Sequence, residues 1–261
     1  MMRSVFLRTL YDKRWFCLGW ALAMAGISIL MIAMFPSLKN SMDELAVSMP
    51  PALQGLVGDV GSFSKLDSYI SSQLYDIRIP LFLMIMAVVL GLAIGPAQEE
   101  KGALRTLLST STSRSSWFIQ TWLSAAVIFA AAIFASCIAT LITASGIGHS
   151  LDTMLVGKLA LISWSFAMCV FTIVFGIGMA VGSRSVALAV GVSLIVASII
   201  LEAGRTVDWL DSFQYVSLLH YYDSSKLLKD GVNPIHQLVI GNLTLISFLV
   251  AVIVFRRRDI S

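Results

Sequence analysis

Long stretches without charge alternate with short polar stretches along the whole chain. Six of the apolar stretches are about as long as a membrane-crossing helix, and they cover residues 15–35, 79–97, 117–146, 159–182, 186–201 and 237–255. A helix needs about 20 apolar residues to cross roughly 30 Å of hydrocarbon. Lipid offers no partners to backbone amides, so each stretch must be helical, and the weak alternation of a membrane barrel is absent. The pattern predicts an all-α, polytopic integral membrane protein with six transmembrane helices.

Composition agrees with this fold class. Hydrophobic residues make up 57% of the chain and charged residues only 13%, too few to cover an ordinary soluble domain. The six spans nearly use up the 261 residues, so we expect a single transmembrane domain over residues 1–261. The net charge of +3 is small and carries no nucleic-acid signal, so the partner that composition predicts is the lipid bilayer.

The basic residues are distributed unevenly between the two sides of the predicted membrane. With both termini inside, 11 of the 18 Lys and Arg residues but only 4 of the 15 Asp and Glu residues lie on the inner side. The positive-inside rule therefore predicts cytoplasmic termini. The residues expected to anchor these ends at the cytoplasmic surface are Arg3, Arg8, Lys13, Arg14, Arg256, Arg257, Arg258 and Asp259.

The segments outside the spans predict short surface elements. Residues 3–14 place Phe6, Leu7 and Leu10 on one helical side, which predicts an amphipathic helix in the inner membrane surface or a simple orientation signal. The outside loop 36–78 is rich in Pro and Gly and predicts short helices and turns. The outside loop 202–236 mixes aromatic residues with charge, which predicts short half-inserted helices before the last span, or an ordinary interfacial loop.

Small residues recur within the spans where helices must approach closely. Gly91 and Gly95 are four residues apart, as are Gly178 and Gly182. Packing drives helix association in lipid, so this spacing predicts tight helix contacts at these four glycines.

No feature of the spans suggests a source of energy. No ionisable residue lies near the centre of any predicted span, although ion-coupled carriers normally require one. The phosphate-binding loop of ATPases is also missing from the sequence, and no catalytic, cofactor or metal site is predicted. If ATP drives transport, another polypeptide must hold the ATP and Mg²⁺.

A charged segment over residues 99–116 joins the second and third predicted spans on the inner side. It begins Glu99-Glu100-Lys101-Gly102-Ala103-Leu104-Arg105 and ends with Ser113-Arg114 before Trp117. Together with the C-terminal run from Phe255 to Ile260, this segment resembles the permease subunits of type-2 ABC transporters. Ala103 stands where that family usually has threonine, and Thr112 where it usually has proline. The six spans and the inside termini also agree with the family.

The resemblance implies a function and partners. In that family the segment after the second span forms a coupling helix that docks on an ATP-binding cassette subunit, and by resemblance Glu99, Glu100, Gly102, Arg105 and Arg114 would make this contact. The simpler interpretation is that these residues end a helix and satisfy the positive-inside rule. A second permease chain, identical or paralogous, would complete a dimer in a bacterial or archaeal plasma membrane. Export or extraction of an amphipathic substrate from the bilayer is expected, and the sequence does not identify that substrate.

Two alternatives to an ABC permease come from other functional classes. Glu99-Glu100 followed by Arg105 is similar to the E-E-x-x-x-R signature of CAAX-type intramembrane endopeptidases, with His220 and His236 as further candidate groups. Here four residues separate the glutamates from the arginine, and the predicted topology places the histidines on the opposite membrane face. An ATP-independent channel or carrier is the other alternative, and the uncharged spans disfavour it.

Overall fold

The computed structural model describes residues 4–48, 65–100, 102, 113–203, 215, 217–222 and 231–258. Every secondary-structure element among these residues is a helix. The elements are α1 (Val5–Asp12), α2 (Arg14–Ser48), α5 (Leu66–Tyr69), the π-helix η1 (Ile70–Arg78), α6 (Ile79–Ile94), α7 (Pro96–Glu100), α9 (Arg114–Gly146), α10 (Thr153–Val181), α11 (Arg184–Ala203), the 3-10 helix η4 (Leu219–Tyr221) and α14 (Pro234–Arg257).

Within the described residues, six helices are long and apolar enough to cross a membrane. They cover Arg14–Lys39, Leu66–Glu100, Arg114–Gly146, Thr153–Val181, Arg184–Leu201 and Pro234–Arg257. Each contains or overlaps one of the six predicted stretches. The prediction of an all-α polytopic membrane protein is therefore confirmed.

The first two spanning helices are longer than the sequence predicted. Helix α2 continues through Pro36 to Ser48, and the helical run of the second span begins at Leu66 instead of Ile79. Both extensions lie in the predicted outside loop 36–78. Their polar composition hid them, because a helix that has left the hydrocarbon needs no apolar residues. The extension brings Asp67, Asp76 and Arg78 into the outer turns of the second span.

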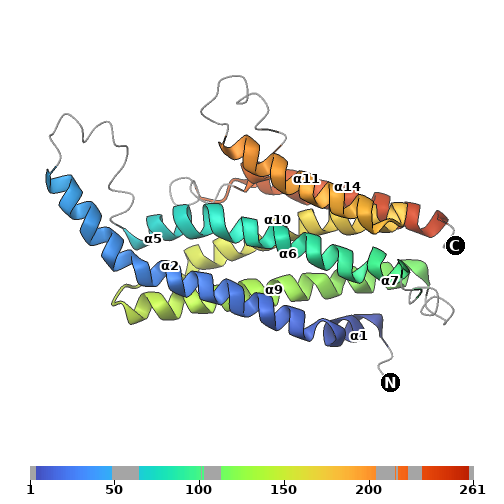
Figure 1. The fold of residues 1–261 in the computed structure, drawn as a ribbon, viewed down its shortest axis with the longest axis horizontal. Coiled ribbons are helices and arrows are strands. Elements are labelled where there is room, and N and C mark those ends of the chain that lie inside the picture. The colour runs from blue at the N-terminus through green and yellow to red at the C-terminus, as the bar shows by residue number, and fades with distance from the viewer. Residues whose placement is uncertain are drawn as a thin grey trace.

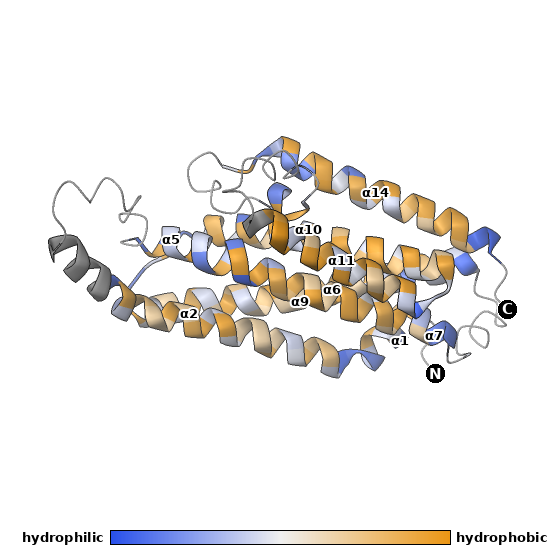
Figure 2. Cartoon of the chain, turned by 45° about the horizontal axis from the view of Figure 1, so that its top comes forward, coloured by the Kyte–Doolittle hydropathy of each residue, from blue (hydrophilic) through white to orange (hydrophobic). Residues whose placement is uncertain are grey.

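The helices run side by side, and both chain ends lie at the same end of the bundle. Figure 1 shows α1, α7 and the C-terminal end of α14 together at this end, while α5 lies at the other. Figure 2 shows hydrophobic residues along the length of the helices and hydrophilic residues gathered at both ends of the bundle. We call the end with α1 and α7 the inner end and the end with α5 the outer end.

Helix α10 is the centre of the bundle and packs against α6, α9, α11 and α14, whereas α2 packs mainly against α9. A cluster of aromatic rings joins α9, α10 and α14. In it the Phe118 and Phe175 ring centroids are 4.8 Å apart, and the Trp117 and Phe255 centroids are 5.7 Å apart. These residues are almost fully buried. Because aromatic rings bury large areas and pack in defined geometries, the cluster fixes the relative positions of the three helices.

Polar side chains within the spans bond to neighbouring helices. The Ser28 and Ser136 hydroxyls are 2.8 Å apart and join α2 to α9. The Trp122 indole N–H donates to the Thr172 hydroxyl at 2.9 Å and joins α9 to α10. Such bonds are characteristic of helix packing in lipid.

Helix α1 is held against the bundle. The Gln120 side-chain carbonyl of α9 accepts a hydrogen bond from the backbone amide of Phe6 at 3.2 Å, and the Ser124 hydroxyl donates to the Phe6 carbonyl at 3.1 Å. Leu10 packs against the core, whereas Leu7 is half exposed. The amphipathic start is thus a helix, and part of its apolar side faces protein.

Candidate functional site

Glu99 and Arg258 form an ion pair at the inner end of the bundle. Glu99 lies in α7, at the inner end of the second span, and Arg258 caps the C-terminus of α14. The guanidinium contacts both carboxylate oxygens, with Nη1 donating to Oε2 at 3.1 Å and Nη2 donating to Oε1. Only 11% of the Glu99 side chain and 20% of the Arg258 side chain are exposed. A bidentate pair of this kind fixes both position and orientation.

Further hydrogen bonds extend the ion pair to two more helices. Arg258 Nη1 also donates to the Met179 carbonyl at the C-terminal end of α10, at 2.8 Å. Arg114, the first residue of α9, donates through Nη1 to the Arg258 carbonyl at 2.5 Å. Arginines at helix C-termini satisfy carbonyls that lack partners in the helix and complement the helix dipole. Glu99, Arg114, Met179 and Arg258 thus tie the inner ends of α7, α9, α10 and α14 together, and we call them the inner-end cluster.

Two of the remaining predicted coupling residues, Glu100 and Gly102, lie beside this cluster. Glu100 is exposed at the end of α7. Gly102 follows with a φ of +69°, in the left-handed region that favours glycine, and its amide donates to the Glu99 carbonyl at 2.9 Å. Gly102 thus lies in a turn at the end of α7. Arg105 lies outside the described residues.

The predicted cytoplasmic anchors are mostly exposed at the same end. Arg8 is exposed and pairs with Asp12 at 3.8 Å, and Arg14 lies over the Tyr11 ring at 3.8 Å from its centroid. Arg256 and Arg257 are exposed at the end of α14. Arg258 instead turns inward to Glu99. Lys13 is half-buried near Gln98 and Trp117, and Arg3 and Asp259 lie outside the described residues.

The four predicted packing glycines all face other parts of the chain. A Cβ at Gly91 would lie 3.4 Å from the Phe175 amide, and one at Gly95 would lie 2.8 Å from the Phe175 ring. A Cβ at Gly178 would lie 3.0 Å from Pro96. Gly182 ends α10 with a φ of +73°, and a side chain there would collide with the Arg258 guanidinium. The small residues therefore allow α6, α7 and α10 to approach closely beside the inner-end cluster.

The histidines considered for an endopeptidase lie at the other end of the bundle. The His220 and His236 rings are 5.5 Å apart near the start of α14. Glu99 contacts Arg258 just beyond the last turn of α14, so it is separated from His236 by about the length of that helix, roughly 33 Å. Glutamates and histidines so placed do not converge on one water or metal ion.

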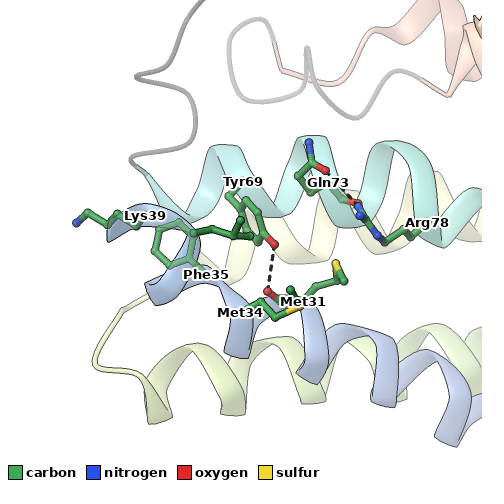
Figure 3. Close-up of a pocket in the computed structure, with 8 residues that line it drawn as sticks. Met31, Met34, Phe35, Lys39, Tyr69, Gln73 and Arg78 are labelled. Atoms are coloured by element: carbon green, nitrogen blue, oxygen red, sulfur yellow. Dashed lines mark hydrogen bonds between the residues drawn. The ribbon is translucent and has the colours of Figure 1, made fainter. Parts of the chain in front are cut away.

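A pocket of about 300 Å³ lies at the outer end between α2 and the α5–η1 segment. Its lining residues come from α2 and from the start of the second span: Met31, Met34, Phe35, Leu38, Lys39, Tyr69, Gln73 and Arg78. The Tyr69 hydroxyl donates to the Met31 carbonyl at 3.2 Å and joins the two walls (Figure 3). We call this cavity the outer pocket.

The outer pocket combines an apolar lining with two cations. Figure 3 shows Lys39 and Arg78 at opposite ends of the pocket, with Phe35 and Tyr69 between them. The Arg78 guanidinium donates to the backbone carbonyl and the side-chain carbonyl of Gln73. The ion pairs found among the described residues, Arg8 with Asp12 and Glu99 with Arg258, involve neither Lys39 nor Arg78. The pocket therefore suits a ligand that is mostly apolar and carries negative charge.

Sequence reasoning missed two features of these sites. It gave Glu99 and Arg258 separate roles, although a carboxylate and a guanidinium at the inner ends of the second and last spans are a natural pair. It placed Lys39, Gln73 and Arg78 in an outside loop, so the outer pocket was not predicted. The signal available was weak, because η1 is a π-helix with polar residues and has no distinctive sequence pattern.

The six long apolar helices define a class, the polytopic membrane proteins. Residues 9–256 match a family described as the C-terminal domain of the multidrug efflux system permease Rv1217c. The match covers nearly the whole chain, so this chain belongs to that family and is a membrane transport permease. A comparison with curated proteins found no match.

Proposed function

We propose that this chain is the permease subunit of an ATP-driven, type-2 ABC exporter. A separate ATP-binding cassette subunit, which would hold ATP and Mg²⁺, docks on residues 99–116, and a second permease chain completes the pathway. The inner end of the bundle faces the cytoplasm. The family's description as a multidrug efflux permease supports export of an amphipathic substrate.

The inner-end cluster is the observation that carries the proposal. Glu99 lies one residue before exposed Glu100, and its ion pair to Arg258 connects α7 with α14, α10 and, through Arg114, α9. A partner that pushes on the segment after Glu100 would displace four helix ends together. The cluster thus gives a physical route by which a force applied outside the membrane reaches helices that cross it.

Helix α1 extends this route to the remaining part of the inner end. A small cavity of about 50 Å³ is lined by α1 residues, by Ile94 and Gln98 of the second span, and by Trp117 and Thr121 of α9. Since α1 is also hydrogen-bonded to α9, its movement would follow that of the cluster. Helix α2 packs against α9, so both helices are connected to the inner-end cluster through the inner end of α9.

The test is co-purification with any ATP-binding cassette ATPase that a neighbouring gene encodes, followed by ATP-dependent efflux from proteoliposomes. We expect Glu100→Lys to lower ATPase recovery about tenfold, because an exposed charge at a docking interface is reversed. Asp12→Lys makes the same charge change at the same end but outside residues 99–116, and it should leave recovery unchanged.

Three results would contradict the proposal. The first is equal ATPase recovery from wild type and Glu100→Lys. The second is solute flux driven by a proton or sodium gradient without any ATPase, which would indicate a carrier. The third is peptide cleavage by the purified chain alone that Glu100→Ala abolishes, which would indicate an endopeptidase.

A further inference from the structure

We propose that the outer pocket binds an anionic amphiphile, with its hydrocarbon tail among the apolar side chains and its carboxylate or phosphate group paired with Lys39 or Arg78. This inference deepens the proposed export function by assigning a substrate class. It rests on that function only for the role of the pocket in transport. Binding itself depends on this chain alone.

The lining explains why the tail would enter. Met31, Met34, Phe35, Leu38 and Tyr69 supply most of the wall. The cavity of about 300 Å³ is at the lower limit of pockets that hold small molecules, which are mostly apolar with a few polar groups. Methionine side chains are flexible and polarisable, so they adapt to tails of different shape. Such a lining fits a family described by multidrug efflux.

The positive charges at the ends of the pocket favour a ligand with negative charge. A cationic ligand would meet Lys39 at one end and Arg78 at the other, and the described residues that line the cavity include no carboxylate. Arg78 is half-buried and already oriented by Gln73. A guanidinium held in place loses little freedom when it binds carboxylate or phosphate.

The position of the pocket gives the ligand a way in from lipid. Met34 is 47% exposed and Leu38 is 36% exposed, so the α2 side of the cavity opens sideways from the bundle. Lys39 is the first charged residue after the long apolar run of α2, where a cationic side chain would reach the headgroup level. An amphiphile in the outer half of the bilayer would thus bring its tail to the methionines and its head to Lys39 or Arg78.

Spin-labelled lipids in phosphatidylcholine nanodiscs that hold the permease without any ATPase test the inference. The probes are spin-labelled stearic acid, its uncharged methyl ester and spin-labelled phosphatidic acid, at about pH 9, where the carboxyl group is ionised. We expect electron paramagnetic resonance to show an immobilised fraction about threefold larger for an acidic probe than for the ester. Binding of phosphatidic acid alone would identify a lipid headgroup as the source of the anion, and binding of stearate alone a free amphiphile.

Two test variants, each with a matched control, assign the signal to the outer pocket. Met34→Trp fills the cavity from an exposed position and should abolish the difference between acid and ester. Leu30→Trp, one turn earlier on the exposed side of α2 and outside the pocket, is the matched control and should bind as wild type does. Lys39→Gln combined with Arg78→Gln should reduce acid binding to the level of the ester, whereas Lys65→Gln, an exposed cation outside the pocket, should not.

Equal immobilisation of stearate and its methyl ester would overturn the inference, as would wild-type binding by Met34→Trp. Because no ATPase is present, these outcomes leave the proposed ATP coupling standing. Conversely, failure to recover an ATPase would leave the binding result unaffected.

Discussion

At the scale of single residues, the ion pair between Glu99 and Arg258 shows how strongly a side chain's role depends on its partner. Both residues are charged and lie just beyond a membrane span, where charge normally faces water. Here both are largely covered, and each satisfies the other. Glu100, the next residue, has the same charge but remains exposed. Two adjacent glutamates thus differ in role, because Glu99 holds helix ends together whereas Glu100 carries its charge at the surface.

Arg258→Gln should lower the stability of the permease more than Glu100→Gln does. Removing the guanidinium leaves the Glu99 carboxylate covered and without its bidentate partner, and it also removes the bond to Met179. We expect a loss of about 1–3 kcal/mol, less than for a fully buried pair because both side chains keep some exposure. Thermal unfolding in detergent measures the effect, with Glu100→Gln as the exposed control.

The double variant Glu99→Gln with Arg258→Gln separates the ion pair from other effects. If the pair stabilises the fold, the two single losses will not add, because the second substitution removes an interaction that is already broken. If the losses of stability in the two single variants add up to the loss in the double variant, the two side chains act independently. That result would contradict the proposal that the inner-end cluster connects the helices mechanically.

At the scale of helices, the contact of α10 with α7 and α11 depends on Gly178. A Cβ there would lie 3.0 Å from Pro96 Cγ and 3.1 Å from Ala187 Cβ, closer than ordinary van der Waals contact. Gly157, on the same helix, has open space at the equivalent position. The two glycines therefore allow a comparison in which helix propensity is constant and only packing differs.

Gly178→Leu should destabilise the bundle, whereas Gly157→Leu should have little effect. We expect a cost of about 1–3 kcal/mol or more at position 178, since overpacking displaces side chains and backbone. Thermal unfolding in detergent and protection of Cys169 from maleimide labelling report the change. Equal behaviour of the two variants would show that α7 does not depend on close contact with α10.

The helices also show which parts of the fold were predictable. The six spans were predicted because their apolar composition follows directly from the thickness of the bilayer. The outer ends of α2 and of the second span were not predicted. Helix α2 continues past Pro36, and the second span begins with α5 and η1, and both extensions contain polar residues that give no apolar signal. The outer pocket lies between these extensions. The sequence shows the residue types that line the pocket, but composition does not predict that helix packing brings them close together.

The inner-end cluster was predicted only in part, because the sequence shows which residues are charged but not which of them are in contact. Glu99, Arg114 and Arg258 were singled out by their charge and by their places next to spans. Their mutual contacts require that four helices end at one level, and this depends on helix length and tilt as well as on sequence. Met179 gave no signal at all, since it takes part through its backbone carbonyl.

At the scale of the whole molecule, the two ends of the bundle differ in chemistry. The inner end carries α1, the inner-end cluster and exposed Arg256 and Arg257, whereas the outer end carries the outer pocket and the two histidines. The positive-inside rule predicts that the inner end lies in the cytoplasm. The proposed division of function requires this orientation, because ATP is cytoplasmic and an exporter must release its substrate on the opposite face.

Single cysteines placed at Asp12 and Lys65 test the orientation directly. Both positions are exposed, one at each end of the bundle, and the native Cys17, Cys137 and Cys169 would first be replaced by alanine. A membrane-impermeant maleimide added to intact cells should label Lys65→Cys and leave Asp12→Cys unlabelled until the membrane is opened. The reverse pattern would place residues 99–116 outside the cell, beyond the reach of any cytoplasmic ATPase, and would refute ATP coupling while leaving the fold and its family unchanged.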